Sequence, residues 1–212
     1  VLSIYDRIPG FLSSHEKRVK INSLDKTNRA ISYEETFFWL ADSMICNECF
    51  SSNDPNVGLS LTENRTYIKC YMNDTGLLFS HAFDEFPEVA KNIYSSILQD
   101  KLSVNKGMLY ENVIAQMLVA SGHKLYFYNH YSEEKHRNDI EIDFIIIRGD
   151  KTNVKISPIE VKSSKKYTTT SLEKFISMFK KRISNSFIIH PKNLSLREDG
   201  IICIPAYMTF CL

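Results

Sequence analysis

The sequence predicts an α/β (α+β) protein in which a mixed β-sheet carries helices on both faces and follows a small helix-and-hairpin module. Residues 105–120 have apolar side chains around most of a helical circumference, which is typical of a buried helix. Residues 141–148 and 156–162 are apolar, β-branched runs joined by a polar turn, the pattern of a β-hairpin. With the patterns that follow, the predicted order from residue 105 onward is α, β, β, β, α, β, β, which indicates a mixed sheet.

The composition is that of a globular protein of one large or two small domains, since the 212 residues include 43% hydrophobic side chains. A formal net charge of +1 gives no global attraction to nucleic acid, so any basic surface has to be local. No apolar run approaches the ~20 residues of a membrane span, so we expect no membrane contact. Five cysteines without a secretion signal favour free thiols and a cytoplasmic location. The chain begins at Val1, and we interpret it as an internal piece of a longer protein.

Residues 1–80 predict a small winged-helix-like module. Residues 32–44 have helical periodicity, and two strand-like runs follow at residues 45–51 and 65–72. A DNA-reading helix needs basic side chains that neutralise phosphates, whereas this helix offers an acidic surface. Its acidic residues are Glu34, Glu35 and Asp42. We therefore favour a packing or partner-docking role for this module, with DNA reading as the alternative.

Smaller features accompany this module. Residues 1–20 are interpreted as a helix remnant or a loop, with a turn at residues 7–10, which contain Pro and Gly. Residues 81–104 are predicted as a bridging amphipathic helical segment. Cys46 and Cys49 form a lone CxxC, which we interpret as structural because a zinc site would need two further ligands and Cys70 is the only nearby candidate.

The remaining elements are assigned from periodicity and turn residues. After the helix, Gly122 is a C-cap, and the polar residues 129–138 are predicted as a loop. Beyond the hairpin, a basic, hydroxyl-rich loop contains Lys165 and Lys166, which could form a phosphate-binding rim. The predicted elements are a strand at 124–128, the hairpin strands at 141–148 and 156–162, a helix at 172–182 and strands at 185–190 and 201–204.

Three charged residues interrupt the apolar pattern of the hairpin. Folding about its turn puts Asp143 opposite Ile159 or Glu160, and Lys162 shares a face with Glu160 because the two are two residues apart on one strand. Glu111, on the apolar helix, adds a third carboxylate. Such a set suits Mg²⁺ or Mn²⁺, which take hard oxygen ligands. The alternatives are an exposed Glu-Lys pair at a strand end and a Glu at the rim of the helix.

A helical Glu, a strand acid and Glu-x-Lys on the next strand match the motif of the PD-(D/E)xK phosphodiesterase superfamily, which has the restriction-endonuclease-like fold. Nearly the whole chain resembles the C-terminal region of a family of prokaryotic AAA+ type ATPases. In that family a P-loop domain is followed by a winged-helix segment and a domain of unknown function resembling these nucleases. The runs that carry the resemblance are Ile8-Pro9 and residues 71–78, 105–112, 141–144 and 158–162.

The resemblance implies a site and a domain arrangement. Glu111, Asp143, Glu160 and Lys162 match the catalytic positions, with Glu111, Asp143 and Glu160 as metal ligands and Glu141 as a secondary candidate. The implied domains are the winged-helix-like module at residues 1–80, the bridge at 81–104 and the nuclease-like domain at 105–212.

The implied function is that of a Mg²⁺-dependent or Mn²⁺-dependent DNA phosphodiesterase at the C-terminal end of an AAA+ ATPase. This sequence contains no P-loop motif, so ATP would be bound only by an N-terminal ATPase domain acting in cis. The alternative is a non-catalytic module that binds nucleic acid or a protein on behalf of the ATPase. The sequence does not determine an oligomeric state.

Overall fold

The computed structural model describes residues 2–14, 17, 19–20, 30–83, 91–93, 95–96, 99, 106–134, 136–149 and 153–212. Its strands are β1 (Val19–Lys20), β2 (Cys46–Ser52), β3 (Glu63–Met72), β4 (Leu125–Ser132), β5 (Arg137–Gly149), β6 (Val154–Val161), β7 (Phe187–His190), β8 (Ser195–Leu196) and β9 (Ile202–Pro205). Its α-helices are α1 (Leu2–Tyr5), α2 (Ile8–Ser13), α4 (Ala30–Asp42), α5 (Thr75–Ala82), α7 (Lys106–Ala120) and α8 (Thr170–Phe179). Its 3₁₀ helices are η1 (Leu59–Leu61), η2 (Lys180–Arg182) and η3 (Ala206–Cys211).

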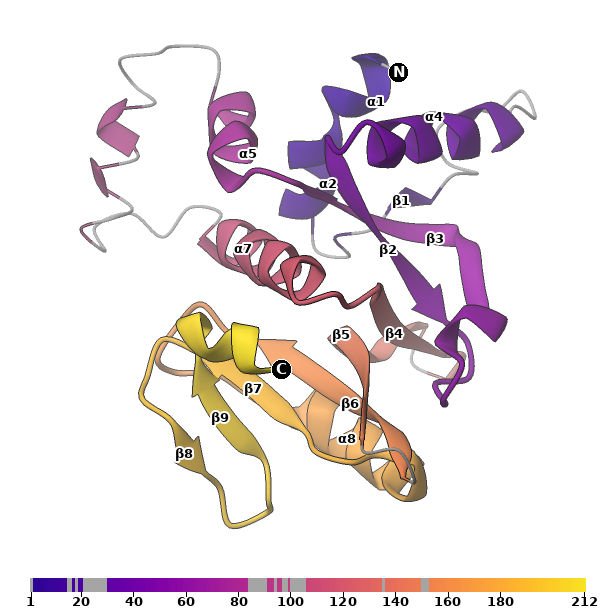
Figure 1. The fold of residues 1–212 in the computed structure, drawn as a ribbon, viewed down its shortest axis with the longest axis vertical. Helices are drawn as coiled ribbons and strands as arrows, with labels where there is room; N and C mark the ends of the chain where they lie inside the picture. The colour runs from indigo at the N-terminus through magenta and orange to yellow at the C-terminus, as the bar shows by residue number, and fades with distance from the viewer. Residues whose placement is uncertain are drawn as a thin grey trace.

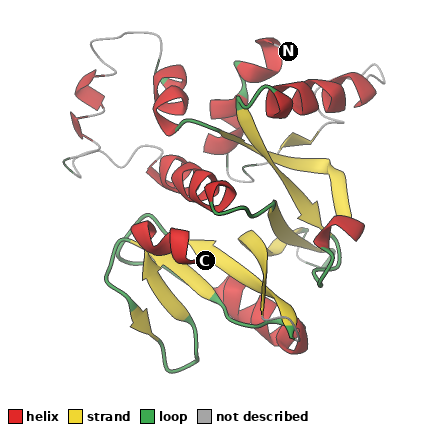
Figure 2. Cartoon of the chain, viewed as in Figure 1, coloured by secondary structure: helices red, strands yellow, loops and turns green. Residues whose placement is uncertain are grey.

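The described strands form one mixed sheet of order β1-β3-β2-β4-β5-β6-β7-β9-β8 (Figure 1). Neighbours from β4 to β6 are antiparallel, whereas β6 and β7, and β7 and β9, are parallel. The helices of the N-terminal half gather at the end of the sheet that holds β1, β3 and β2 (Figure 2). The mixed α/β fold predicted from the sequence is therefore confirmed at this level.

Helices α7 and α8 cover opposite faces of the sheet. Helix α7 buries Ile114 and Leu118 in one apolar core together with Phe144 of β5. Helix α8 buries Phe175 in a second core, where its ring meets the edge of Tyr128 at 5.2 Å between centroids. Side chains that alternate along a strand point to opposite faces, so one strand feeds both cores.

The predicted hairpin is present as β5 and β6, and its register determines the neighbours of Asp143. Phe144 pairs with Ile159, so Asp143 and Glu160 are the next residues beyond the last pair. At the other end Gly149 has φ 148°, and a Cβ atom there would lie 2.2 Å from the carbonyl oxygen of Asn153. Glycine is therefore required where the two strands meet the turn.

The N-terminal strands also follow the prediction locally, but they continue the same sheet. Strands β2 and β3 form the expected hairpin and α4 precedes them. Strand β2 then pairs in parallel with β4, with Cys49 beside Leu125. The division into three domains stays a prediction, and most of the bridging segment at 81–104 lies outside the described residues.

Two local predictions are wrong. The polar stretch at 129–138 is mostly strand, because β4 runs to Ser132 and β5 begins at Arg137, where the two strands pair as a hairpin. Both faces at the exposed end of a two-stranded ribbon are in contact with solvent, so its side chains are polar and the sequence resembles that of a loop. The turn predicted at residues 7–10 is wrong for residues 8–10, because these belong to α2, where Pro is well suited to the first turn. This agrees with the helix alternative for residues 1–20.

All five cysteines are free, as expected from the sequence. Cys46 and Cys49 are both buried in β2, which is consistent with the structural interpretation of the CxxC pair.

Within the described part of the chain, none of the helices is both long and apolar enough to cross a membrane.

Asn112 connects α7 to the end of β3 and provides a test of this packing. Its side chain is fully buried, accepts from the Met72 N–H at 2.8 Å and donates to the Met72 carbonyl at 3.0 Å. Asn112→Ala leaves both backbone groups buried without a partner, so we expect the free energy of unfolding to fall by about 2–5 kcal/mol. Urea denaturation measures the change. Asn193→Ala, at an exposed side chain, is the control and should change it by less than about 0.5 kcal/mol.

Candidate functional site

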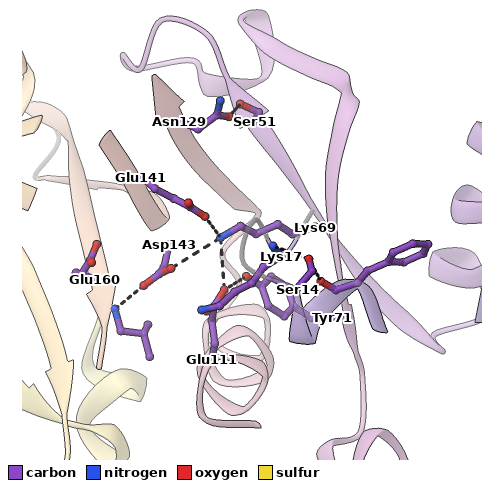
Figure 3. A network of polar contacts seen from close by, with 12 residues as sticks. Ser14, Lys17, Ser51, Lys69, Tyr71, Glu111, Asn129, Glu141, Asp143 and Glu160 are labelled. Atoms are coloured by element: carbon purple, nitrogen blue, oxygen red, sulfur yellow. Dashed lines mark hydrogen bonds and ion pairs between the residues drawn. The ribbon is translucent and has the colours of Figure 1, made fainter. Parts of the chain in front are cut away.

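Three elements bring the predicted acidic residues together from distant parts of the chain, and a fourth element packs beside them (Figure 3). Asp143 comes from β5, Glu160 from β6 and Glu111 from α7. Strand β3 adds Lys69 and Tyr71, to which the sequence analysis assigned no role. Asp143 lies between Glu160 and Lys69, so it joins two groups of side chains that differ in chemistry (Figure 3).

The first group contains Asp143, Glu160 and Lys162. The Lys162 Nζ lies 2.6 Å from Glu160 Oε1, which confirms that these two residues share a face. Asp143 Oδ2 accepts a hydrogen bond from the Val161 N–H at 2.8 Å, which links β5 to the end of β6. Glu160 Oε2 is buried and has no hydrogen-bond partner among the residues that the structure describes. A buried carboxylate oxygen without a partner is costly, so this position favours a proton or a cation.

The electrostatics of Glu160 agree with that geometry. Burial and the nearby negative charge of Asp143 raise the pKa of the Glu160 carboxyl to about 8, and together they outweigh the opposing effect of Lys162. Two carboxylates that approach each other in a buried place disfavour double ionisation. Glu160 is therefore a carboxyl whose ionisation within the folded protein needs compensation.

The second group is centred on Lys69, a lysine whose side chain has no solvent exposure. Its Nζ lies 3.4 Å from Glu111 Oε1, 3.5 Å from Glu141 Oε1 and 3.8 Å from Asp143 Oδ1. The same Nζ is 5.0 Å from the ring centroid of Phe127, a distance typical of a cation–π contact. Burial lowers the pKa of Lys69, but the three carboxylates together raise it by more than burial lowers it. The net shift of the pKa is upward, so Lys69 keeps its positive charge.

Glu111 has partners at both carboxylate oxygens. Lys17 Nζ pairs with Oε2, while the Tyr71 hydroxyl donates to Oε1, which Lys69 also approaches. Burial alone would raise the pKa of Glu111, but the charges of Lys69 and Lys17 lower it to about 2. Glu111 is thus an ionised carboxylate inside a network of positive and hydroxyl donors.

Glu141 is the secondary candidate of the sequence analysis, and it belongs to the Lys69 group. It lies on β5, two residues from Asp143, and its side chain is 26% exposed. Burial raises its pKa, and Asp143 and Glu111 add to the rise while Lys69 opposes it. Glu141 is consequently the acid of this group most open to solvent.

Among the described residues, no group of three or more His, Cys, Asp and Glu side chains is arranged to hold a metal ion. The reason lies in the placement of the acids: Glu111, Glu141 and Asp143 surround an ammonium group. Asp143 and Glu160 remain as a pair of adjacent carboxylates, and Mg²⁺ commonly binds one or two carboxylates while it keeps several waters.

Sequence reasoning missed Lys69, although β3 contains a signal. Lys69 and Tyr71 share one face of the strand, and both are completely buried. A lysine on the same face as a large apolar residue, inside an apolar run, has to find acidic partners. The sequence of β3 does not show which acids are the partners of Lys69, because those acids lie on α7 and β5, far away in the chain. Lys17 carries no comparable signal.

The basic loop follows β6 directly. Lys165 and Lys166 are both exposed, a few residues beyond Glu160 along the chain. Their role as a phosphate-binding rim stays a prediction.

Comparison with known families gives one match. A family model described as a domain of unknown function, DUF4143, matches residues 106–208. Searches of curated proteins and of solved structures returned no match. The matched span contains Glu111, Asp143, Glu160 and Lys162, whereas Lys69 lies before it.

Two conservative substitutions should have opposite effects on stability. The Glu111 carboxyl, with a pKa of about 2 against an ordinary 4.5, contributes stability that is complete above pH 4.5 and is lost as the pH falls towards 2. Glu111→Gln should therefore lower the free energy of unfolding at pH 7 by on the order of 3 kcal/mol. Chemical denaturation at pH 7 measures the loss.

Glu160→Gln should stabilise the protein at high pH. A carboxyl with a pKa of about 8 favours folding in its protonated form, so wild-type stability declines as the pH rises from 4.5 through 8. We expect the variant to exceed wild type by at least about 1 kcal/mol at pH 8.5 and to match it near pH 5. Thermal melts at both pH values measure the difference, and an equal loss at both would contradict the assignment.

Proposed function

We propose that this chain carries a metal-dependent phosphodiesterase site that acts on DNA, with Asp143 and Glu160 as the metal-binding pair and Lys162 beside them. The observation that carries the proposal is the buried, unpartnered Oε2 atom of Glu160 next to the Asp143 carboxylate. A divalent cation bound here would give Glu160 Oε2 a partner and would also offset the repulsion between the Asp143 and Glu160 carboxylates. Burial with a specific charge partner is also typical of functional carboxylates.

The donor chemistry fits the ion. Asp143 and Glu160 offer hard carboxylate oxygens, the ligands that Mg²⁺ and Mn²⁺ prefer. Asp143 is already oriented by the Val161 N–H, so it need not be ordered when the ion binds. The ligand role predicted for Glu111 stays a prediction, since Lys17 donates a hydrogen bond to one of its oxygens and the Tyr71 hydroxyl to the other. Asp143 is less fully engaged, because its Oδ1 has a contact of 3.8 Å with the Lys69 Nζ, longer than a hydrogen bond.

Each residue then has a role in phosphodiester hydrolysis. A bound Mg²⁺ would supply Lewis-acid activation of the scissile phosphate and of a water. Asp143 and Glu160 would hold the cation. The Lys162 Nζ, 2.6 Å from Glu160, is next to the same carboxylate and so can stabilise the negative charge that develops on the phosphate. The exposed Lys165 and Lys166 would contact the DNA backbone.

The wider setting is part of the proposal. We propose a restriction-endonuclease-like fold for residues 105–212, supported by the order of the elements around β4, β5 and β6 and by the position of the acids. We propose that a P-loop ATPase domain of the AAA+ type acts in cis with this region and binds the ATP. Residues 1–80 would then be its winged-helix segment.

A second candidate function is a non-catalytic docking module of the same ATPase. The observation that favours it is the Lys69 group, in which three of the four acids already neutralise a buried ammonium. In this case the acidic residues stabilise the fold, and the surface serves to bind nucleic acid or a protein.

Metal binding separates the two candidates. With Mn²⁺ at about 100 times its dissociation constant, the wild-type unfolding free energy should rise by about 2.7 kcal/mol and the melting temperature by roughly 5–10 °C. Asp143→Asn and Glu160→Gln should abolish the rise because each removes a ligand. Thermal melts with and without Mn²⁺ measure it, and no rise in wild type favours the docking module.

Activity is tested with supercoiled plasmid and Mn²⁺. We expect wild type to nick the plasmid and the Glu160→Ala/Lys162→Ala double variant to be slower by at least about 100-fold. The matched control is Glu173→Ala/Arg197→Ala, which removes a surface ion pair of 3.2 Å and should keep full activity. Equal nicking by wild type and by the Glu160/Lys162 variant would exclude this site as the source of the cleavage.

A further inference from the structure

Lys69 is a buried ionisable group that the proposed function leaves unused. Its side chain is completely enclosed, so it cannot touch a substrate. A solitary ammonium at such a depth would be very unfavourable, and the three carboxylates around it are what make it tolerable. The reverse also holds: without Lys69, three acids would face one another at the edge of a buried core.

The carboxylate atoms around Lys69 are of the kind that a second metal ion would use. Glu111 Oε1, Glu141 Oε1 and Asp143 Oδ1 all lie within 3.8 Å of its Nζ. Sites that cleave phosphodiesters with two metal ions hold them about 3.5–4 Å apart and share ligands between them. Here Asp143 would be the shared residue, because its carboxylate lies between Lys69 and Glu160 (Figure 3). Its Oδ1 is 3.8 Å from the Lys69 Nζ, and its Oδ2 accepts from the Val161 N–H.

We propose that the Lys69 ammonium takes the place of a second divalent cation, so that the site binds one metal ion, at Asp143 and Glu160. The inference rests on the proposed function for the first ion. Lys69 is then a positioning residue: its Nζ attracts Asp143 Oδ1 across 3.8 Å while the Val161 N–H donates to Oδ2, so the carboxylate is oriented and each oxygen keeps a lone pair for the ion.

Lys17 is the natural comparison, because it also pairs with Glu111. It differs in two respects. Its side chain is 29% exposed, and it pairs with Glu111 Oε2, whereas Lys69 approaches Oε1. Removing Lys17 takes away one positive charge but leaves the ammonium among the three acids in place. Comparing the two lysine variants therefore distinguishes the loss of one positive charge, which both variants share, from the opening of a cation-binding position, which we expect in Lys69→Ala alone.

The experiment counts Mn²⁺ ions per chain by equilibrium dialysis of the full chain, with Mn²⁺ as the sole divalent ion. We expect one ion in wild type, two in Lys69→Ala and one in Lys17→Ala. Lys69→Ala/Glu141→Gln should return to one ion because it loses a ligand of the opened position. A merely structural role for Lys69 would lower stability without raising the number of bound ions.

The outcomes decide the inference in each case. Two ions in wild type, or an unchanged count in Lys69→Ala, would overturn it. If Lys69→Ala is unfolded in metal-free buffer, recovery of its circular dichroism spectrum in Mn²⁺ supports the replacement, and failure to recover contradicts it. If wild type binds no Mn²⁺, the proposed metal function fails, whereas one ion in Lys69→Ala and none in Lys17→Ala would still support a cation role for Lys69.

Discussion

The arrangement of this protein depends on one buried ammonium and the carboxylates that neutralise it. Lys69 reaches from β3 to acids on α7 and β5, so the ion pairs join the N-terminal strands, a central helix and the hairpin of the sheet. Buried ion pairs contribute little net stability, because desolvation offsets their attraction, but removing one partner is severely destabilising. The network therefore specifies which elements meet, more than it adds to the free energy of folding.

Two acids of the site, Glu111 and Glu160, differ in how far their charges are compensated by neighbouring groups. Glu111, with partners at both oxygens, has a pKa near 2, whereas Glu160, with one oxygen unpartnered and Asp143 nearby, has a pKa near 8. The two residues are of one type and are almost equally buried, so the difference comes from their neighbours. A fully compensated carboxylate is suited to holding a fold together. A carboxylate with only one oxygen compensated is suited to binding a cation, and this is Glu160, whose Oε1 pairs with Lys162.

The location of Lys69 also bears on what constitutes the functional unit. The family match begins at residue 106, but the partners of Glu111 come from residues 17, 69 and 71, and β2 pairs with β4. The N-terminal strands thus contribute both hydrogen bonds to the sheet and charges to the acid cluster. If the site is catalytic, its electrostatics are set by residues that precede the matched span.

The sequence by itself determined the local elements and the Asp143, Glu160 and Lys162 group. Helix α7 and the β5–β6 hairpin follow from apolar periodicity and turn residues, and the two-residue spacing placed Glu160 and Lys162 on one face. The predicted loop at 129–138 failed because the polar end of a hairpin has no apolar alternation to mark it.

Only the tertiary structure decided that Lys69 lies among the acids, that Glu111 serves it as a counter-ion and that the N-terminal hairpin extends the same sheet. These facts depend on contacts between residues that are far apart in the sequence, such as Lys69 with Asp143 and Cys49 with Leu125. Periodicity describes one element at a time. The partner of a buried charge is set by how several elements pack, and no local pattern records it.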